Sequence, residues 1–240
     1  AMILGPILTV NMGLSGVFWV TAFLGVMGVG IVIFLVPRRV SSYHNREVIA
    51  DVRQIRYLLK DRTLLRLNSG IFALHFALMA AFVAVPMILS TELSIEDSEL
   101  PLVYLVLLGG GFFIMLPIMM LGEKYKLQRL TFLGAVAVMA GATLVLGFER
   151  NPLITPFLLL VFFTAFNLLE ATLPSWLSKS SPAGNRGTAM GIYSTSQFLG
   201  SFAGGVLGGW SLQEIGADGL FIVISLVLFV WWVLSLGLQS

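Results

Sequence analysis

Glu170 is the side chain in this sequence whose type and setting most favour chemistry, because it stands alone in the apolar stretch from Phe157 to Trp176. A charge at bilayer depth costs roughly 2.5–3.5 kcal/mol on insertion scales, so an acid there usually faces a water-filled cavity or relays protons. In a low dielectric such a carboxylate is expected to bind and release a proton at working pH. The alternative is a structural carboxylate, tied to a neighbouring helix by hydrogen bonds.

His75 is the second candidate, because it is the one histidine inside an apolar stretch. At 1.5 Å per residue, His75 lies about 13 Å and Glu170 about 12 Å from the basic ends of their stretches, so the two are expected at similar depth. We therefore assign proton coupling to Glu170 and His75. A core histidine with satisfied hydrogen bonds is the competing interpretation.

Further residues at helical spacing are expected to surround these two side chains as the wall of a cavity. Asn167 shares a helix face with Glu170, while Met79 and Phe82 share one with His75. The expected wall residues are Asn167, Tyr193, Gln197, Met79, Phe82, Phe163 and Phe166. Such a wall, partly polar and partly aromatic, would bind amphipathic molecules, although packing alone is the alternative for Tyr193 and Gln197.

Glycines recur every four residues in the stretch that follows Arg186. Gly200, Gly204 and Gly208 fall on one helix face, with Gly205 and Gly209 beside them. Small residues at this spacing let two membrane helices approach closely. We expect this face to be a packing surface and not part of a binding site.

The elements that must hold these residues are membrane-spanning helices. Of the 240 residues, 58% are hydrophobic and 11% charged, whereas soluble domains carry about 25% charged residues. Spans of about 20 apolar residues match a hydrocarbon layer roughly 30 Å thick. The expected spans are residues 16–36, 67–89, 102–121, 130–148, 154–177, 187–210 and 219–238. The sequence predicts an all-α integral membrane protein, and the apolar residues 1–10 look like the tail of one more helix, as in a fragment.

The charges predict the orientation of these spans. Every lysine and arginine except Arg150 falls in loops on one side of the predicted membrane, while the opposite loops are mainly acidic. Cytoplasmic loops carry an excess of Lys and Arg, so residues 37–66 are expected in the cytoplasm.

Residues 37–66 contain a basic amphipathic pattern, in which Val48, Val52, Ile55 and Leu59 recur at helical spacing. A helix of this kind suits either the anionic inner membrane surface or packing against the protein. Nucleic-acid binding is a poor alternative, because this short segment is tethered between two spans.

Several functional classes find no support in the sequence. There are no cysteines, which excludes disulfides, thiol catalysis and cysteine-bound metal. The segment 13–16 has the Gly-x-Ser-Gly pattern of an intramembrane serine protease, but its only candidate base, His75, is expected near the other side of the membrane. We therefore expect no enzyme activity, no cofactor and no metal site.

Short motifs resemble those of the major facilitator superfamily. Gly5-Pro6 is similar to the end of the antiporter motif on the fifth helix of drug/proton antiporters. Residues 122–126 resemble the family's Gly…Asp-Arg-x-Gly loop, with Glu123 and Lys124 at the Asp-Arg positions and Lys126 in place of the second glycine. The most specific similarity, to bacterial inner-membrane members, lies in residues 166–170, 181–191 and 193–200.

The resemblance implies the C-terminal half of a twelve-helix fold. Residues 1–36 would be the end of helix five and helix six, residues 37–66 the central cytoplasmic loop, and residues 67–240 a six-helix bundle of inverted three-helix repeats. It also implies proton-coupled efflux of small amphipathic compounds across the bacterial inner membrane by alternating access, with an N-terminal transmembrane half as partner. The alternatives are a channel or pore and a membrane scaffold that transports nothing.

Overall fold

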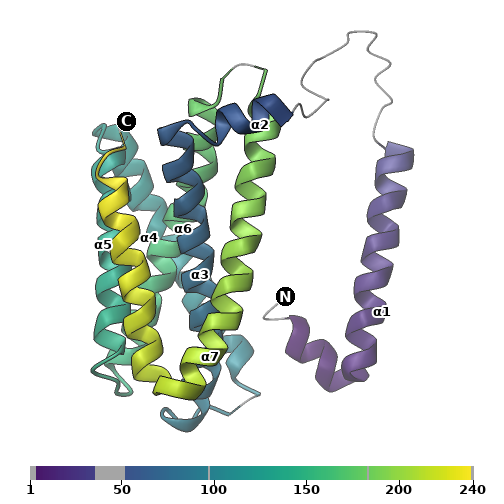
Figure 1. Cartoon of the computed structure of the whole chain (residues 1–240). Coiled ribbons are helices and arrows are strands. Elements are labelled where there is room, and N and C mark those ends of the chain that lie inside the picture. The colour runs from purple at the N-terminus through teal and green to yellow at the C-terminus, as the bar shows by residue number, and fades with distance from the viewer. Residues whose placement is uncertain (1–3, 36–51, 97, 183, 239–240) are drawn as a thin grey trace.

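The computed structural model describes residues 4–35, 52–96, 98–182 and 184–238, and it is helical, with no strand in these ranges. The helices are α1 (Leu4–Leu35), α2 (Val52–Leu58), α3 (Arg62–Thr91), α4 (Leu100–Lys124), α5 (Gln128–Leu146), α6 (Ile154–Ser180) and α7 (Arg186–Ser235). All except α2 contain a segment long and apolar enough to cross a membrane. Helices α3 to α7 form a bundle, and α1 stands apart from it (Figure 1). The prediction of an all-α membrane fold is confirmed.

Two glycines reverse the chain inside long helices. Gly216 (φ 71°, ψ −177°) divides α7 into two spans, and Gly13 (φ 69°, ψ 175°) divides α1 in the same way. This backbone region is open essentially only to glycine. The expected spans end at residue 210 and resume at residue 219, and the loop that they imply at residues 211–218 is wrong. The structure has helix on both sides of Gly216, and the polar side chains of this segment lie at the two helix ends.

Glycines also form the crossings between the two three-helix sets, which are α3–α5 and α6 with the two spans of α7. Gly200, Gly204 and Gly208 of α7 lie against the backbone of α3, where any added Cβ would collide. Gly111 of α4 does the same on α6, where a Cβ would lie 2.9 Å from the Thr164 nitrogen. The first helix of each set thus packs on the second helix of the other, as an inverted repeat requires, and the expected glycine packing surface is confirmed.

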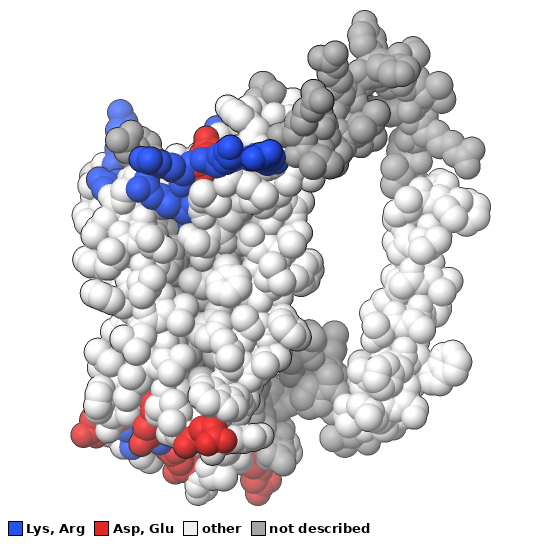
Figure 2. All heavy atoms as spheres, in the orientation of Figure 1, with Lys and Arg blue, Asp and Glu red and all other residues white. Residues whose placement is uncertain are grey.

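Basic residues gather at one end of the bundle and acidic residues at the opposite end (Figure 2). At the basic end, two arginines bind the chain just after α7. Arg129 Nη2 donates to the Leu236 carbonyl at 2.7 Å, and Arg66 donates to the Gly237 carbonyl. Both cations therefore satisfy carbonyls beyond the last turn of α7, where the helix dipole favours positive charge. This segregation of charge agrees with the expected orientation.

Arg150, the basic residue at the acidic end, is held by two carboxylates. It donates to Glu92 at 2.8 Å and pairs with Asp218. Burial lowers the pKa of Arg150, but the bonds to Glu92 and Asp218 outweigh that effect and hold it above its ordinary value. Arg150 therefore stays charged while linking α3, the α5–α6 connection and α7.

Only part of the basic amphipathic pattern in residues 37–66 is described, because residues 36–51, including Val48, lie outside the described residues. Leu58, which ends α2, is buried, whereas Leu59 is 45% exposed. Leu58 joins the bundle core and α2 contacts α7, which favours packing on the protein over lying on the membrane.

Asp61 sets the start of α3. Its carboxylate accepts hydrogen bonds from the backbone nitrogens of Thr63 at 2.8 Å and Leu64 at 3.0 Å. This N-cap begins the helix at Arg62, five residues before the apolar stretch at Leu67. Hydropathy places the start of α3 too late, because the first turn of the helix is charged.

Candidate functional site

Three helices bring Glu170, His75 and Gln197 together. The Gln197 side-chain nitrogen lies 2.8 Å from His75 Nε2 and 3.4 Å from Glu170 Oε1. His75 Nδ1 lies 3.8 Å from Glu170 Oε2. The cluster therefore joins α3, α6 and the first span of α7.

The glycine crossing explains how α7 can reach this position. Gly200 lies against the backbone of Phe72 and Gly204 against that of Phe76. Gln197 precedes Gly200 by three residues, and His75 follows Phe72 by three. Because the two helices touch without intervening side chains, the amide of Gln197 can reach the imidazole.

The hydrogen bonds assign a protonation pattern to the cluster. Gln197 has one amide NH₂ group, which can donate one hydrogen to His75 Nε2 and the other to Glu170 Oε1. His75 Nε2 must then be an acceptor, so the imidazole carries its proton on Nδ1. That nitrogen is the one facing the second carboxylate oxygen of Glu170.

The facing atoms lack hydrogen bonds of good geometry. His75 Nδ1 and Glu170 Oε2 are both buried and form no such bond among the described residues, although the backbone of Ile71, one turn earlier in α3, interacts with the imidazole. The His75 side chain is 11% exposed, and that of Glu170 is 37% exposed. Buried polar atoms are usually paired, so this gap of 3.8 Å singles the pair out. Chemically, the arrangement can hold a proton on either residue, with access from the open side of Glu170.

Aromatic rings build the wall on one side of the cluster. Phe166 meets the edge of the His75 ring at 5.8 Å between centroids, and Phe82 lies 5.8 Å from Phe163. Tyr104, which the sequence analysis missed, packs edge-on against Phe82 at 6.0 Å. Its signal was its spacing, because Tyr104 lies seven residues before the crossing Gly111, on the buried face of α4.

The remaining expected wall residues take different places. Asn167 donates to the Leu108 carbonyl of α4 at 3.2 Å, so it ties α6 to α4 and forms no hydrogen bond with Glu170. Tyr193 is buried, lies within electrostatic reach of Glu170, and has no partner for its hydroxyl among the described residues. Met79 is 36% exposed.

The motif residues lie away from this cluster. Glu123 and Lys124 are exposed at the basic end of the bundle, where α4 ends, and Gly5 and Pro6 fall in the helical start of α1. Lys126 has a left-handed backbone (φ 56°), with Leu127 N bonded to Gly122 O and Lys126 N to Glu123 O. This is a Schellman motif, in which glycine is the usual residue at the left-handed position.

Among the described residues there is no group of three or more His, Asp and Glu side chains that could hold a metal ion.

Comparison with known proteins gives consistent results. A sequence profile of the Major Facilitator Superfamily matches residues 67–239. The chain is 39% identical over 236 residues to the inner membrane transport protein YajR of Escherichia coli (strain K12), covering 96% of this chain and 51% of that protein. It is 31% identical over 209 residues to an uncharacterized transporter, BU466, of Buchnera aphidicola subsp. Acyrthosiphon pisum. This match covers 85% of this chain and 53% of that protein.

The matches cover only part of the length of each relative. A second Buchnera transporter, from subsp. Baizongia pistaciae, is 29% identical over 244 residues, which is 98% of this chain and 61% of that protein. The chain thus spans little more than half the length of the curated relatives it matches. With its bundle of membrane-spanning helices and a family match over most of its residues, the chain belongs to the Major Facilitator Superfamily.

Proposed function

We propose that this chain forms the C-terminal half of a secondary transporter of the bacterial inner membrane, which exports small amphipathic compounds in exchange for protons. The names of the relatives support transport and, for YajR, the inner membrane. The observation that carries the proton coupling is the contact of Glu170 with Gln197 and His75 across three helices.

Protonation of Glu170 is the proposed switch. The ionised carboxylate draws the amide of Gln197 and faces the Nδ1 proton of His75, so it holds α3, α6 and α7 together. A proton on Glu170 removes the charge and weakens both attractions, so the helices are freer to separate. Because charge-assisted hydrogen bonds are about twice as strong as neutral ones, each protonation state favours a different facing of the cavity.

His75 is proposed to pass the proton. Its Nδ1 proton lies 3.8 Å from Glu170 Oε2, and a small approach would close this gap to a hydrogen bond. Transfer from Nδ1 to the carboxylate would need Nε2 to regain a proton, and Nε2 is the atom that Gln197 now contacts. A rotation of the Gln197 amide would therefore open and close the relay.

The aromatic wall is proposed to bind the substrate. Phe82 is partly exposed and Met79 is 36% exposed, while Phe166 and the two rings that contact Phe82, Phe163 and Tyr104, are buried. Apolar contact with these groups would hold a compound beside the carboxylate. Substrate and proton would then compete for one region, as exchange requires.

An N-terminal half is proposed as the partner across the cavity. The turn at Gly13 repeats the backbone of the turn at Gly216 within a few degrees. If α1 holds the end of helix five and helix six, these two turns occupy equivalent places in two related halves. This likeness supports the division into residues 1–36, the cytoplasmic segment 37–66 and the bundle 67–240.

The test is transport in vesicles that contain the intact protein, with ethidium as a fluorescent amphipathic probe. We expect an imposed pH gradient to drive ethidium movement, and its collapse by an ionophore to stop net accumulation. A channel would instead pass ethidium down its own gradient at a rate that the pH gradient does not change. A scaffold would move no ethidium under either condition.

A further inference from the structure

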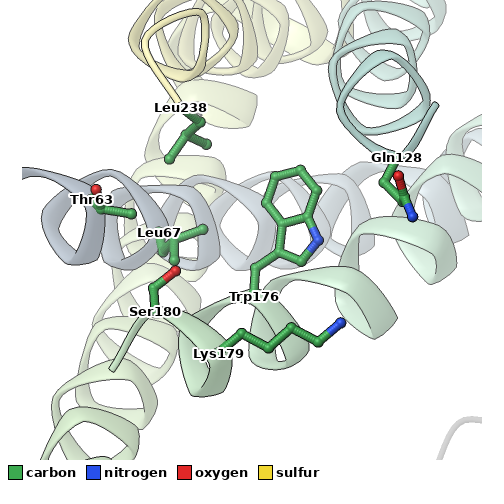
Figure 3. Close-up of a pocket in the computed structure, with 7 residues that line it drawn as sticks. All are labelled: Thr63, Leu67, Gln128, Trp176, Lys179, Ser180 and Leu238. Carbon is green, nitrogen blue, oxygen red and sulfur yellow. The ribbon is translucent and has the colours of Figure 1, made fainter. Parts of the chain in front are cut away.

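Three cavities lie along α5 and α6; the first also reaches α3 and Leu238, whereas the other two reach α4. The first, about 260 Å³, is lined on its polar side by Thr63, Gln128, Trp176, Lys179 and Ser180 (Figure 3). The second, about 140 Å³, shares Gln128, Trp176 and Lys179 with the first. The third, about 510 Å³, shares Thr131 and Leu168 with the second. Because neighbouring cavities share walls, the three lie in a row, which we call the path.

The residues shared by the first two cavities present hydrogen-bond donors. The indole nitrogen of Trp176 and the ammonium group of Lys179 point to the same side as the Gln128 amide (Figure 3). Lysine and tryptophan side chains can only donate. Within the described part of the chain, neither Lys179 nor Trp176 has a hydrogen-bond acceptor or an ion-pair partner for these nitrogens. This end of the path therefore suits an anion.

The acidic residue nearby lies farther along the path. Glu123 lines the second cavity, while none of the described acidic residues lines the first. An anion beside Lys179 in the first cavity thus has a cation as its nearest charge. Each lysine near the membrane surface strengthens binding to anionic lipid by about fivefold.

The third cavity is apolar and runs along α5 and α6. Because these two helices are antiparallel, its lining from Leu127 to Val138 lies in the basic half of the bundle, and its lining from Phe157 to Leu168 lies in the other half. Its two threonines, Thr131 and Thr164, bond their own helix carbonyls, so they present mainly methyl groups.

We propose that this path binds an anionic diacyl glycerophospholipid of the cytoplasmic leaflet. The headgroup phosphate accepts from Lys179, Trp176 and Gln128, and one acyl chain lies in the cavity along α5 and α6. The combination of a donor cluster with an adjacent apolar groove selects a lipid over a free phosphate, which would use only the first cavity. The site is separate from the transport proposal and stands without it.

Trp176 allows the binding to be measured. The intact protein is placed in phosphatidylcholine nanodiscs that contain small fractions of either phosphatidylglycerol or phosphatidylcholine with brominated acyl chains, which quench nearby tryptophan fluorescence. A background in which Trp19, Trp210, Trp231 and Trp232 are replaced by phenylalanine leaves Trp176 as the sole tryptophan and isolates its signal. We expect the phosphatidylglycerol to quench Trp176 at about fivefold lower fraction than the phosphatidylcholine. Equal quenching by the two lipids would overturn the proposal.

Lys124 offers a matched control for the headgroup. Lys124 and Lys179 both lie in the last turn of a helix at the same end of the bundle, but only Lys179 lines the cavities. Lys179→Gln is expected to abolish the preference for phosphatidylglycerol, and Lys124→Gln to preserve it. Equal loss in both variants would reduce the site to general surface charge. Displacement of the lipid by millimolar inorganic phosphate would show a free-anion site and overturn the lipid assignment.

Two glycines of α5 provide the test of the acyl groove. Gly134 lines the third cavity, and Gly141 lines a different cavity beside the second span of α7. Neither has an atom within 4 Å of an added Cβ, so both tolerate a larger side chain. Gly134→Leu is expected to weaken quenching by phosphatidylglycerol severalfold, and Gly141→Leu to leave it unchanged. The reverse order, or no difference, would contradict the placement of the chain.

Discussion

His75 Nδ1 and Glu170 Oε2 face each other at 3.8 Å without a well-formed hydrogen bond among the described residues, while Gln197 contacts the remaining polar atom of each. A purely structural cluster would close this distance, because unpaired buried polar atoms cost free energy. The open pair instead leaves a place where a proton can be gained or lost. Coupling between the proton and the helices therefore depends on Gln197 as much as on the two titratable groups.

Replacing Gln197 with leucine should uncouple transport from the proton. The variant keeps side-chain volume but removes both donors, and a hydrogen bond to a charged group contributes about 1.5–3 kcal/mol. We expect ethidium movement driven by a pH gradient to fall about tenfold or more. Thr195→Val is the control, because Thr195 is exposed and bonds only its own helix at Gly191. Equal effects of the two changes would speak against a bridging role for Gln197.

Replacing His75 with glutamine should distinguish a role in proton transfer from a structural role. Glutamine can accept a hydrogen bond from Gln197 as His75 does, but it does not gain or lose a proton at working pH. The expected result is slower movement driven by a pH gradient, with exchange of ethidium between the two sides retained. Unchanged coupled movement in His75→Gln would remove His75 from the proton path and leave Glu170 to act alone.

The crossing of α3 and α7 predicts a position-specific effect on stability. Gly204→Ala places a methyl group into the backbone at Phe76, whereas Gly205→Ala points into open space one residue later. Overpacking of this kind typically costs about 1–3 kcal/mol. We expect thermal unfolding in detergent to shift down for Gly204→Ala and to change little for Gly205→Ala. Similar shifts would show that the glycines are not at the contact.

Lys126 should be a stabilising site for glycine. Its left-handed backbone (φ 56°) closes the Schellman motif after α4, and that conformation costs a residue with a Cβ about 1–2 kcal/mol. Lys126→Gly is expected to raise the thermal unfolding midpoint. Lys124→Gly, within the helix, should lower it because glycine weakens helix interiors. A lower midpoint in both would contradict this assignment.

The sequence predicted the helical membrane fold because apolar length and charge placement are properties of single segments. It also placed Glu170 and His75 at similar depth, since depth follows from counting residues along each helix. Their lateral neighbours could not be derived in this way. Rotation of α7 about its axis is set by the contact of Gly200 and Gly204 with α3, so the bond from Gln197 emerges only from packing.

Other features were hidden because local chemistry outweighs hydropathy. The N-cap at Asp61 begins α3 before its apolar stretch, and a single residue, Gly216, makes a turn where eight residues looked like a loop. Tyr104 was missed because its spacing of seven residues from Gly111 carries meaning only once Gly111 is known to lie against α6. The family motif at residues 122–126 gave the position of the left-handed residue, although Lys126 stands there in place of glycine.

Glu170 as the proton carrier is the central claim, and a comparison of two transport modes in Glu170→Gln tests it most directly. Glutamine keeps the shape and can still bond Gln197, so the fold and ethidium binding should persist. Glu149→Gln, which changes an exposed loop carboxylate, serves as the control. We predict that Glu170→Gln retains exchange of ethidium across vesicles but loses accumulation driven by a pH gradient, while Glu149→Gln keeps both. Accumulation by Glu170→Gln at the unmodified rate would contradict the account.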